Sequence, residues 1–364
     1  MAQAMNVKEL FGKKSTMMLG IDIGSHAIKA VQLSGSGSKY RLDAFAIEPL
    51  PKGAMNDREI QDIEAVGRAI QKIRRKFSRK ITQAAAAVSG SSVITKIVFM
   101  DAGMREDEME SQIEIEADSL IPYPLNEISL DFEPLGPNPA DPSKINVLLS
   151  AARTETVQTK VDALAGAQLE AKVIDVEGYA LARGAEFCMS QLPSDASEKN
   201  IALIDVGANM MLFSIMQGGE VIYTRDQIFG GDQYTKSIAS YYNQPYEDAE
   251  VAKLSGNLPP NYEMEVLAPF QTALVQQIRR AIQMFITSSG HEQVDYLMIS
   301  GGTSCIAGLD KLLVEELGIH TIVANPFVEM GAASSVKKEE LALKASNLVV
   351  ATGLALRSFS SWHI

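Results

Sequence analysis

The stretch 19-LGIDIGSHAIKAVQL-33 sets one aspartate, Asp22, inside an apolar strand and interrupts that strand with a glycine turn. Much the same phrase returns as 202-ALIDVGANMMLFSIM-216, where Asp205 takes the place of Asp22 and Gly207 that of Gly24. In each copy a second glycine turn and a third strand-like run follow. A repeat separated by about half of the chain predicts two related lobes, each built on strands joined by tight turns.

The repeated phrase has the chemistry of a phosphate and metal site. An ionised aspartate at the end of an apolar strand costs several kcal/mol unless it finds opposite charge or hydrogen bonds, and a hydrated divalent metal is one such partner. Glycine two residues later lets the turn approach a ligand, and successive N–H groups there bind anions. One hairpin alone is compatible with an ordinary β-turn. Two in register predict one cleft in which Asp22 and Asp205 hold Mg²⁺ beside phosphates.

Lys29 lies in the same strand as the first turn, on the face that also carries Val31 and Leu33. A bare ammonium group among apolar side chains is costly, so a bound phosphate is one candidate counterion. The other interpretation is that Lys29 reaches water at a strand edge or pairs with a carboxylate. The periodicity leaves both open.

Composition excludes several classes of protein. The chain has 364 residues, of which 46% are hydrophobic and 21% charged, as expected for a folded protein with more than one core. Its formal net charge of -12 argues against binding to nucleic acid or to an anionic lipid surface. Cys188 and Cys305 belong to no zinc or disulfide motif, and no Walker sequence, GxSxG elbow or histidine metal spacing occurs. No apolar run approaches the length of a membrane span.

Three phrases resemble the phosphate-1, phosphate-2 and adenosine motifs of the actin, heat-shock chaperone and sugar-kinase ATPase superfamily: DIGSHAIKA, IDVGANMMLFSI and MISGGTSCIAGL. The resemblance implies an α/β, actin-like (ribonuclease H-like, duplicated) ATPase fold of two lobes, with ATP and Mg²⁺ as cofactors. It also implies that Gly24, Ser25 and Lys29 of the first lobe hold phosphates, as do Gly207 and Asn209 of the second. Gly301, Gly302 and Thr303 would let the adenosine lie against the backbone. A plain strand-to-helix turn is the alternative explanation of Gly301 and Gly302.

Longer phrases narrow the resemblance further. EIEADSLIPYPLNEISLDFEPLG, DVEGYALAR and FGGDQYT closely resemble the PilM family of type IV pilus assembly proteins. Membership would imply a cytoplasmic ATP-binding adaptor of pilus biogenesis and twitching motility, peripheral at the inner membrane. Its partner would be the cytoplasmic N-terminal peptide of the membrane protein PilN, bound in a groove between the first lobe and an inserted module. The resemblance also allows binding to other platform and motor proteins, and association of the chain with further copies of itself. No motif identifies individual groove residues.

The order of elements and this resemblance together divide the chain. In a helix of the inserted module, Met109, Ile113, Ala117 and Leu120 fall on one face and are expected to be buried. The predicted parts are a mobile tail (1–16), subdomain 1A (17–90), an FtsA-like inserted α+β subdomain 1C (91–170), a return to 1A (171–198), subdomain 2A (199–235), a mostly helical 2B (236–293), the second part of 2A (294–335) and a C-terminal helix returning to 1A (336–364).

Catalysis would need a further residue that positions water. Glu177 in VEGYALA resembles the glutamate that positions water in superfamily hydrolases, but Gly178 replaces a proline of the related phrase, so we expect slow ATP hydrolysis at best. An exposed carboxylate favoured at a helix N-terminus is the alternative. Gln277 and Arg280 are candidates to contact ribose and adenine, although amphipathic spacing also explains them. His26 faces either a phosphate or solvent.

Two other functions remain in competition. An FtsA-like, filament-forming division ATPase would need a membrane-targeting amphipathic C-terminal helix, and LRSFSSWHI is too short and too weakly basic for one. A small-molecule kinase of the same superfamily would need a catalytic aspartate beside its acceptor, for which Asp101 and Asp175 are the candidates. Neither aspartate sits in a sugar-kinase phrase.

Overall fold

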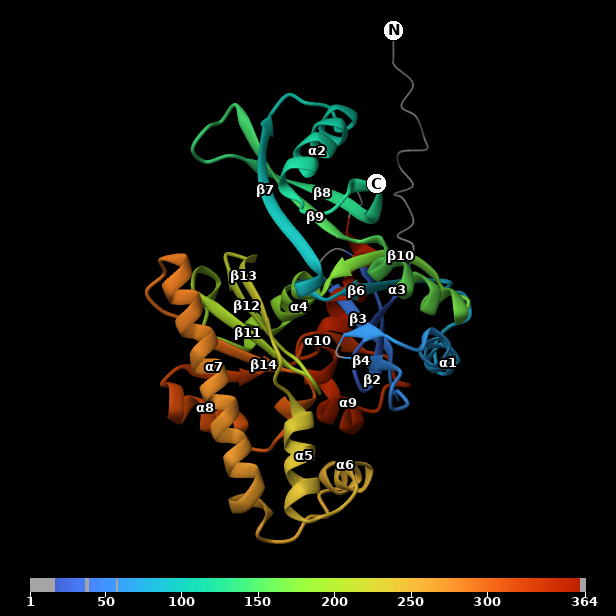
Figure 1. Ribbon diagram of the computed structural model, residues 1–364, viewed down its shortest axis with the longest axis vertical. Coiled ribbons are helices and arrows are strands. Elements are labelled where there is room, and N and C mark those ends of the chain that lie inside the picture. The colour runs from blue at the N-terminus through green and yellow to red at the C-terminus, as the bar shows by residue number, and fades with distance from the viewer. Residues whose placement is uncertain (1–16, 37–38, 57, 361–364) are drawn as a thin grey trace.

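The computed structural model describes residues 17–36, 39–56 and 58–360, which form two facing lobes and a third, smaller unit above them (Figure 1). The predicted tail 1–16 lies outside the described residues. Within these ranges, no helix combines the length and apolar composition that a bilayer crossing requires.

The first lobe is built on a six-stranded sheet of order β10-β6-β1-β2-β3-β16. Its strands are β1 (Met18–Ile23), β2 (Ala27–Ser36), β3 (Lys39–Pro49), β6 (Gln83–Val88), β10 (Glu170–Val176) and β16 (Gly331–Ala332). A short hairpin, β4 (Met55–Asn56) and β5 (Glu59–Ile60), precedes the first helix. The helices of this lobe are α1 (Ile63–Arg74), α3 (Thr154–Gly166), α4 (Glu177–Ala185), α9 (Lys338–Lys344) and α10 (Val349–Leu356).

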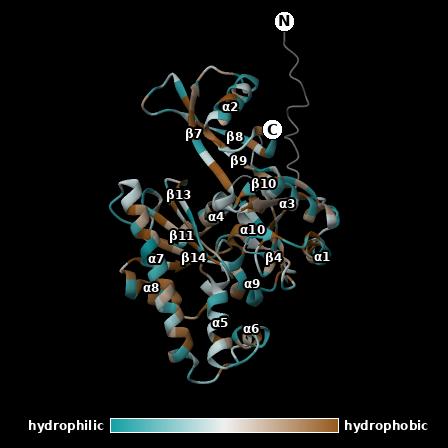
Figure 2. Ribbon diagram, in the orientation of Figure 1, coloured by the Kyte–Doolittle hydropathy of each residue, from teal (hydrophilic) through white to brown (hydrophobic). Residues whose placement is uncertain are grey.

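The second lobe repeats the first. Its sheet has the order β13-β12-β11-β14-β15, so an antiparallel meander is again followed by two parallel neighbours. The strands are β11 (Ile201–Val206), β12 (Met211–Gln217), β13 (Glu220–Gln227), β14 (Tyr296–Ser300) and β15 (His320–Val323). The helices are α5 (Gly231–Tyr241), α6 (Tyr246–Ser255), α7 (Ala268–Ser289) and α8 (Leu309–Leu317). Helix α7 shows both colours of an amphipathic helix in Figure 2. The matching strand orders confirm the duplication that the repeated phrase predicted.

The third unit is an antiparallel sheet of order β7-β9-β8, covered by α2 (Glu106–Leu120) at the top of Figure 1. Its strands are β7 (Val93–Asp101), β8 (Ile128–Pro137) and β9 (Lys144–Arg153). It has a core of its own, to which Met109, Ile113 and Ala117 contribute from the predicted face of α2. Leu120, the fourth residue of that face, is 37% exposed, and its neighbour Ile121 is buried instead, because the helix ends at Leu120 and the chain turns inward after it.

Helix α3 belongs to the first lobe rather than to the third unit. Ala163 and Leu164 pack into the core beneath the six-stranded sheet, together with residues of α1. The sequence analysis had assigned residues up to 170 to the insert, whereas the three-stranded sheet ends at Arg153. The rest of the subdomain division stays a prediction.

Helices α4 and α10 lie between the two sheets and join the lobes through one apolar cluster, which includes Met18, Leu203 and Met298. All eight residues of α10 are buried. The backbones approach so closely that a Cβ atom on Gly20, Gly184 or Gly353 would overlap backbone atoms of the neighbouring element. This packing fixes the floor of the cleft between the lobes.

Short helical turns complete the chain. The 3-10 turns are η2 (Gly90–Ser92), η3 (Leu125–Glu127), η4 (Glu186–Gln191), η5 (Ala196–Glu198), η7 (Gly302–Cys305), η8 (Ala345–Leu348) and η9 (Arg357–Phe359), and η6 (Glu263–Leu267) is a π-helical turn.

Candidate functional site

The β1–β2 hairpin carries the first half of the candidate site. Asp22 and Lys29 face each other in register, and Lys29 Nζ lies 2.9 Å from Asp22 Oδ2. Both side chains are largely buried, at 12% and 20% exposure. Of the two interpretations of Lys29, pairing with a carboxylate is therefore the one observed in this structure. Ser25 lies in the turn between the two strands.

Asp205 carries the second half. It lies on β11 beside Ser300 of β14, whose Oγ donates a hydrogen bond of 2.8 Å to Asp205 Oδ1. Burial raises the pKa of Asp205, although Lys29 and the hydrogen bond from Ser300 act in the opposite direction. Burial alone would lower the pKa of Lys29, but the charges of Asp22 and Asp205 outweigh that effect and raise it. The Lys29 ammonium group thus interacts with both carboxylates, so the two hairpins lie close together, as their repetition predicts.

Glu177 begins α4 directly after β10, and β10, β6 and β1 run parallel. The carboxyl ends of parallel strands meet at one edge, which places Glu177 on the same side of the sheet as Asp22. Glu177 forms an ion pair with Arg58, and the two side chains are only 13% and 18% exposed. The alternative of an exposed helix-terminal carboxylate is therefore wrong. Arg58, in the β4–β5 turn, was not among the predicted site residues.

The turn glycines have distinct surroundings. Gly24 N donates to Ala27 O and Gly207 N donates to Met210 O, closing the two hairpins. A Cβ on Gly24 would lie 2.8 Å from Lys29 Nζ, so any side chain there would push the ammonium group away.

Gly301 and Gly302, which follow β14, have different surroundings: the first is packed against β11, and the second faces open space. Gly301 has a φ of +83°, and a Cβ there would lie 2.5 Å from Val206 O, so close packing on β11 accounts for it. Gly302 instead faces open space. Thr303 Oγ1 donates to Gly207 O at 3.4 Å, which ties this turn to the second hairpin. Asn209 Oδ1 in that hairpin is buried and has no hydrogen-bond partner among the residues that the structure describes.

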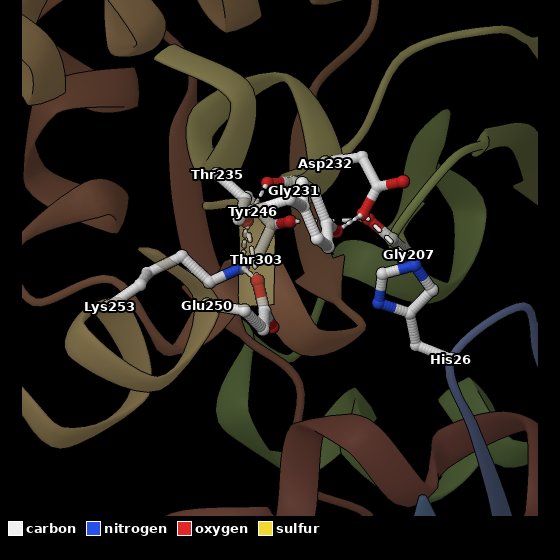
Figure 3. A network of polar contacts seen from close by, with 9 residues as sticks. All are labelled: His26, Gly207, Gly231, Asp232, Thr235, Tyr246, Glu250, Lys253 and Thr303. Carbon is white, nitrogen blue, oxygen red and sulfur yellow. Dashed lines mark hydrogen bonds and ion pairs between the residues drawn. The ribbon is translucent and has the colours of Figure 1, made fainter. Parts of the chain in front are cut away.

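A polar network links the first hairpin to helices α5 and α6 of the second lobe (Figure 3). His26 Nε2 of the first hairpin lies 3.0 Å from Asp232 Oδ1 at the start of α5, and Tyr246 Oη donates to the same oxygen at 2.6 Å. His26 therefore contacts the opposite lobe rather than facing solvent alone. A second pair, Lys52 and Glu247 at 2.7 Å, also crosses between the lobes.

Two further charged residues of this network were missed by the sequence analysis. Lys253 Nζ lies 2.6 Å from Glu250 Oε2 and donates to Thr235 Oγ1 at 2.7 Å (Figure 3). A Cβ on Gly231 would lie 3.9 Å from Lys253 Nζ and 3.2 Å from Thr303 Oγ1. Lys253 therefore lies near Thr303 of the adenosine motif, and the same Cβ would lie 3.8 Å from the carbonyl oxygen of Gly207 in the phosphate-2 motif. The available signal was the Glu–Lys spacing of three residues on a helix soon after the FGGD turn.

Other candidates do not join the site. Gln277 is half-buried and Arg280 exposed on α7, and within the described chain no hydrogen bond or ion pair links either to the hairpins. Their role toward ribose and adenine stays a prediction. Asp101 pairs with Lys144 in the third unit, and Asp175 is held by Arg183 and Arg357. Neither aspartate faces the cleft carboxylates as a free base, which removes support from the kinase alternative.

Comparisons with known proteins agree with this geometry. The sequence profile of the family described as Type IV pilus assembly protein PilM matches residues 20–359. The solved PilM-PilN type IV pilus biogenesis complex aligns at 27% identity and a TM-score of 0.78, covering 95% of this chain and 99% of that chain. The ethanolamine utilization protein EutJ from Carboxydothermus hydrogenoformans aligns at 15% identity and a TM-score of 0.56, covering 93% and 89%.

A curated relative is the cell division protein FtsA of Bacillus subtilis (strain 168), 20% identical over 367 residues that cover 88% of this chain and 80% of FtsA. Together with the two aligned structures, this confirms the actin-like fold predicted from the three motifs.

Proposed function

Because the chain belongs to the PilM family of type IV pilus assembly proteins, we propose that it is a nucleotide-binding adaptor of the pilus assembly machinery. Its partner is the cytoplasmic N-terminal peptide of PilN, which holds the adaptor at the cytoplasmic face of the inner membrane and links the membrane platform to the motor. The observation that carries the proposal is the similarity over 95% of the chain to the PilM-PilN complex.

The proposed peptide groove lies between the first lobe and the third unit. One feature that supports a docking role for this unit is its uncovered sheet face. Val98 and Met100 of β7 point into the core under α2, so the alternating Ile97 and Phe99 point away from it, and they are 54% and 63% exposed. Apolar side chains in such a position suit the few apolar anchors of a short peptide.

The proposed cofactors are ATP and Mg²⁺, bound between the lobes. Asp22 and Asp205 would take the metal through its waters, because no group of three or more His, Cys, Asp or Glu side chains in the described residues is arranged to hold it alone. The backbone of both hairpins would hold the phosphates, and the partnerless Asn209 Oδ1 fits a site completed by a hydrated ligand. The open space beside Gly302 and the charged pair Glu250 and Lys253 would accommodate the nucleoside.

When bound, Mg²⁺ would supply charge neutralisation to the phosphates. The protein's own groups would bind and orient the nucleotide: Asp22 would hold the hydrated metal, Lys29, now paired with Asp22, would contact a phosphate, and the two lobes would close on the ligand. Glu177 would be the group that orients water, and its ion pair with Arg58 supports the proposal of slow hydrolysis at best.

The adaptor proposal is tested by calorimetric titration of a synthetic peptide, taken from the cytoplasmic tail of the cognate PilN, with and without Mg·ATP. We expect saturable one-to-one binding whose affinity depends on the nucleotide. Absence of binding in both states would contradict the proposal. Light scattering that then revealed ATP-dependent filaments would favour the FtsA-like alternative, to which the 20% identity with FtsA corresponds.

The metal site is tested separately with Asp22→Ala and Asp205→Ala. Each removes one carboxylate from the cleft, so we expect Mg·ATP affinity to fall by on the order of tenfold or more while the protein stays folded. Undiminished affinity in both variants would contradict the two-carboxylate site. Asp248→Ala, at an exposed position of α6, is a matched control.

A further inference from the structure

The β4–β5 hairpin is fixed at its base and carries Arg58 near its tip. Ala54 and Ile60 are buried in the core of the first lobe, and Ala54 O accepts hydrogen bonds from both Gln61 N and Asp62 N. Asp62 then caps α1 by accepting from Ala65 N. The sheet and helix α1 thus hold the hairpin, so the position of Arg58 in the cleft is set by rigid elements.

The ion pair of Arg58 with Glu177 is mostly buried, and a structural role alone explains it poorly. Burying two opposite charges brings little net stability over apolar side chains of the same size. The pair lies at the same sheet edge as Asp22, where the proposed metal and phosphates bind. The positive charge of Arg58 also acts to lower the pKa of Lys29 and of Asp205, so Arg58 is near enough to both hairpins to act on them.

Several cations in this space are close enough to act on an anionic ligand. Asp22 is paired with Lys29, Glu177 with Arg58, and Asp205 accepts from Ser300. Lys160 of α3 is 5% exposed and acts on Asp22, yet no hydrogen bond or ion pair to it exists in the part of the chain that the structure describes. The three carboxylates Asp22, Glu177 and Asp205 are thus equalled in number by three cations, Lys29, Arg58 and Lys160, and a phosphate that enters this space would meet all three cations.

We propose that Arg58 is a ligand of the terminal phosphate of ATP and the residue by which this protein distinguishes ATP from ADP. The inference rests on the proposed nucleotide site. A guanidinium group binds phosphate oxygens through two parallel hydrogen bonds, which a carboxylate partner prepares for by fixing its orientation. In the ADP complex Arg58 stays with Glu177. In the ATP complex Arg58 turns to the phosphate, and the Glu177 carboxylate is released toward the cleft.

The experiment compares the dissociation constants of Mg·ATP and Mg·ADP for the wild type, Arg58→Ala, Arg58→Lys and Glu177→Gln. Loss of a charged hydrogen-bonding group should weaken ATP binding on the order of tenfold to a hundredfold in Arg58→Ala, with ADP affinity nearly unchanged. Arg58→Lys keeps the charge without the paired geometry, so its ATP affinity should be intermediate. Glu177→Gln frees Arg58 and should bind ATP at least as tightly as the wild type.

The controls separate this inference from the proposed site. Arg68→Ala removes an exposed arginine of α1 and should change neither constant. An ATP-to-ADP affinity ratio that is the same in Arg58→Ala and Arg58→Lys as in the wild type would overturn the role of Arg58 while leaving the nucleotide site intact. A wild type that binds neither nucleotide would overturn both. Should Arg58→Ala fail to fold, the ratio in Arg58→Lys decides.

Discussion

Lys160 shows what a single buried charge costs. It is 5% exposed on α3, and burial lowers its pKa to about 8, although Asp22 acts to raise it. A depressed lysine pKa means that the unfolded chain binds the proton more tightly than the folded protein does. The free energy of unfolding is therefore reduced below pH 8, and this loss disappears as the pH rises from 8 to the ordinary lysine value.

Replacing Lys160 by methionine should therefore stabilise the protein. At pH 7 we expect the free energy of unfolding to increase by roughly 3 kcal/mol, and the difference from the wild type to vanish near pH 10. Denaturant titrations at several pH values measure both. Lys172→Met, at an exposed position of β10, is the control and should change neither. A stabilisation of Lys160→Met that is the same at pH 7 and pH 10 would show that packing, not charge, is responsible.

Among single residues, those of the repeated motif could be predicted from the sequence, whereas those that approach the site from other parts of the chain could not. Asp22, Asp205 and Lys29 were identified because strand alternation and the repeat both constrain them. Arg58 belongs to a two-residue strand pair with no periodicity of its own, and only the folded hairpin brings it to Glu177. Glu250 and Lys253 had the spacing of an ordinary helix-surface ion pair.

Helix α10 is the element on which the first lobe depends most. Its Gly353 faces α4 so closely that a Cβ would overlap Ala180 O, and the whole helix is buried. Gly353→Ala forces the two backbones apart, so we expect a loss of roughly 3 kcal/mol and a lower melting temperature. Gly103→Ala is the control, because a Cβ at that exposed position meets nothing within 4 Å. Equal melting temperatures for both variants would contradict the close packing.

Helix patterns predicted faces better than ends. Met109, Ile113 and Ala117 were correctly placed in a core by their spacing, whereas Leu120 was not, because the last turn of α2 no longer covers the sheet. The packing of α3 on α1 also could not be predicted from the spacing of apolar residues. It depends on which of two sheets the chain returns to after Arg153, a long-range choice that local spacing does not encode.

The whole molecule is held closed across the cleft by polar contacts at separate places. His26 meets Asp232, Lys52 meets Glu247, and Asp226 accepts hydrogen bonds from Ser89 Oγ and Ser91 N. The pair of Lys52 and Glu247 is 78% and 62% exposed, so it contributes little. Asp232 is 15% exposed. Burial alone would raise its pKa, but the hydrogen bonds from His26 and Tyr246 outweigh that and lower it.

Asp232→Asn should therefore loosen the closed arrangement. The loss of charge weakens the contact with His26 by about 1 kcal/mol, so the nucleotide-free protein should have a larger radius of gyration in small-angle X-ray scattering. Mg·ATP should restore the compact value, because the ligand joins both hairpins. Asp248→Asn, exposed on α6, is the matched control. An unchanged radius in Asp232→Asn would show that the apolar floor alone sets the angle between the lobes.

The repeat predicted the architecture at this scale, since the strands β3-β2-β1-β6-β10 of the first sheet have the same arrangement as β13-β12-β11-β14-β15 of the second, with β16 added at one edge. It did not predict how the lobes touch, because those contacts join turns whose sequences carry no mutual signal.

The last feature is the place of α10 in the order of synthesis. Met18 N donates to Ser358 Oγ across 340 positions of sequence, so β1 is among the first strands made and among the last to be covered. Until residues 327–356 have been translated, the apolar face formed by Val31, Leu33 and Leu42 lacks the later residues that pack on it. The nascent chain therefore exposes this apolar surface on the ribosome while the second lobe is synthesised, and we expect chaperones to bind it during that time.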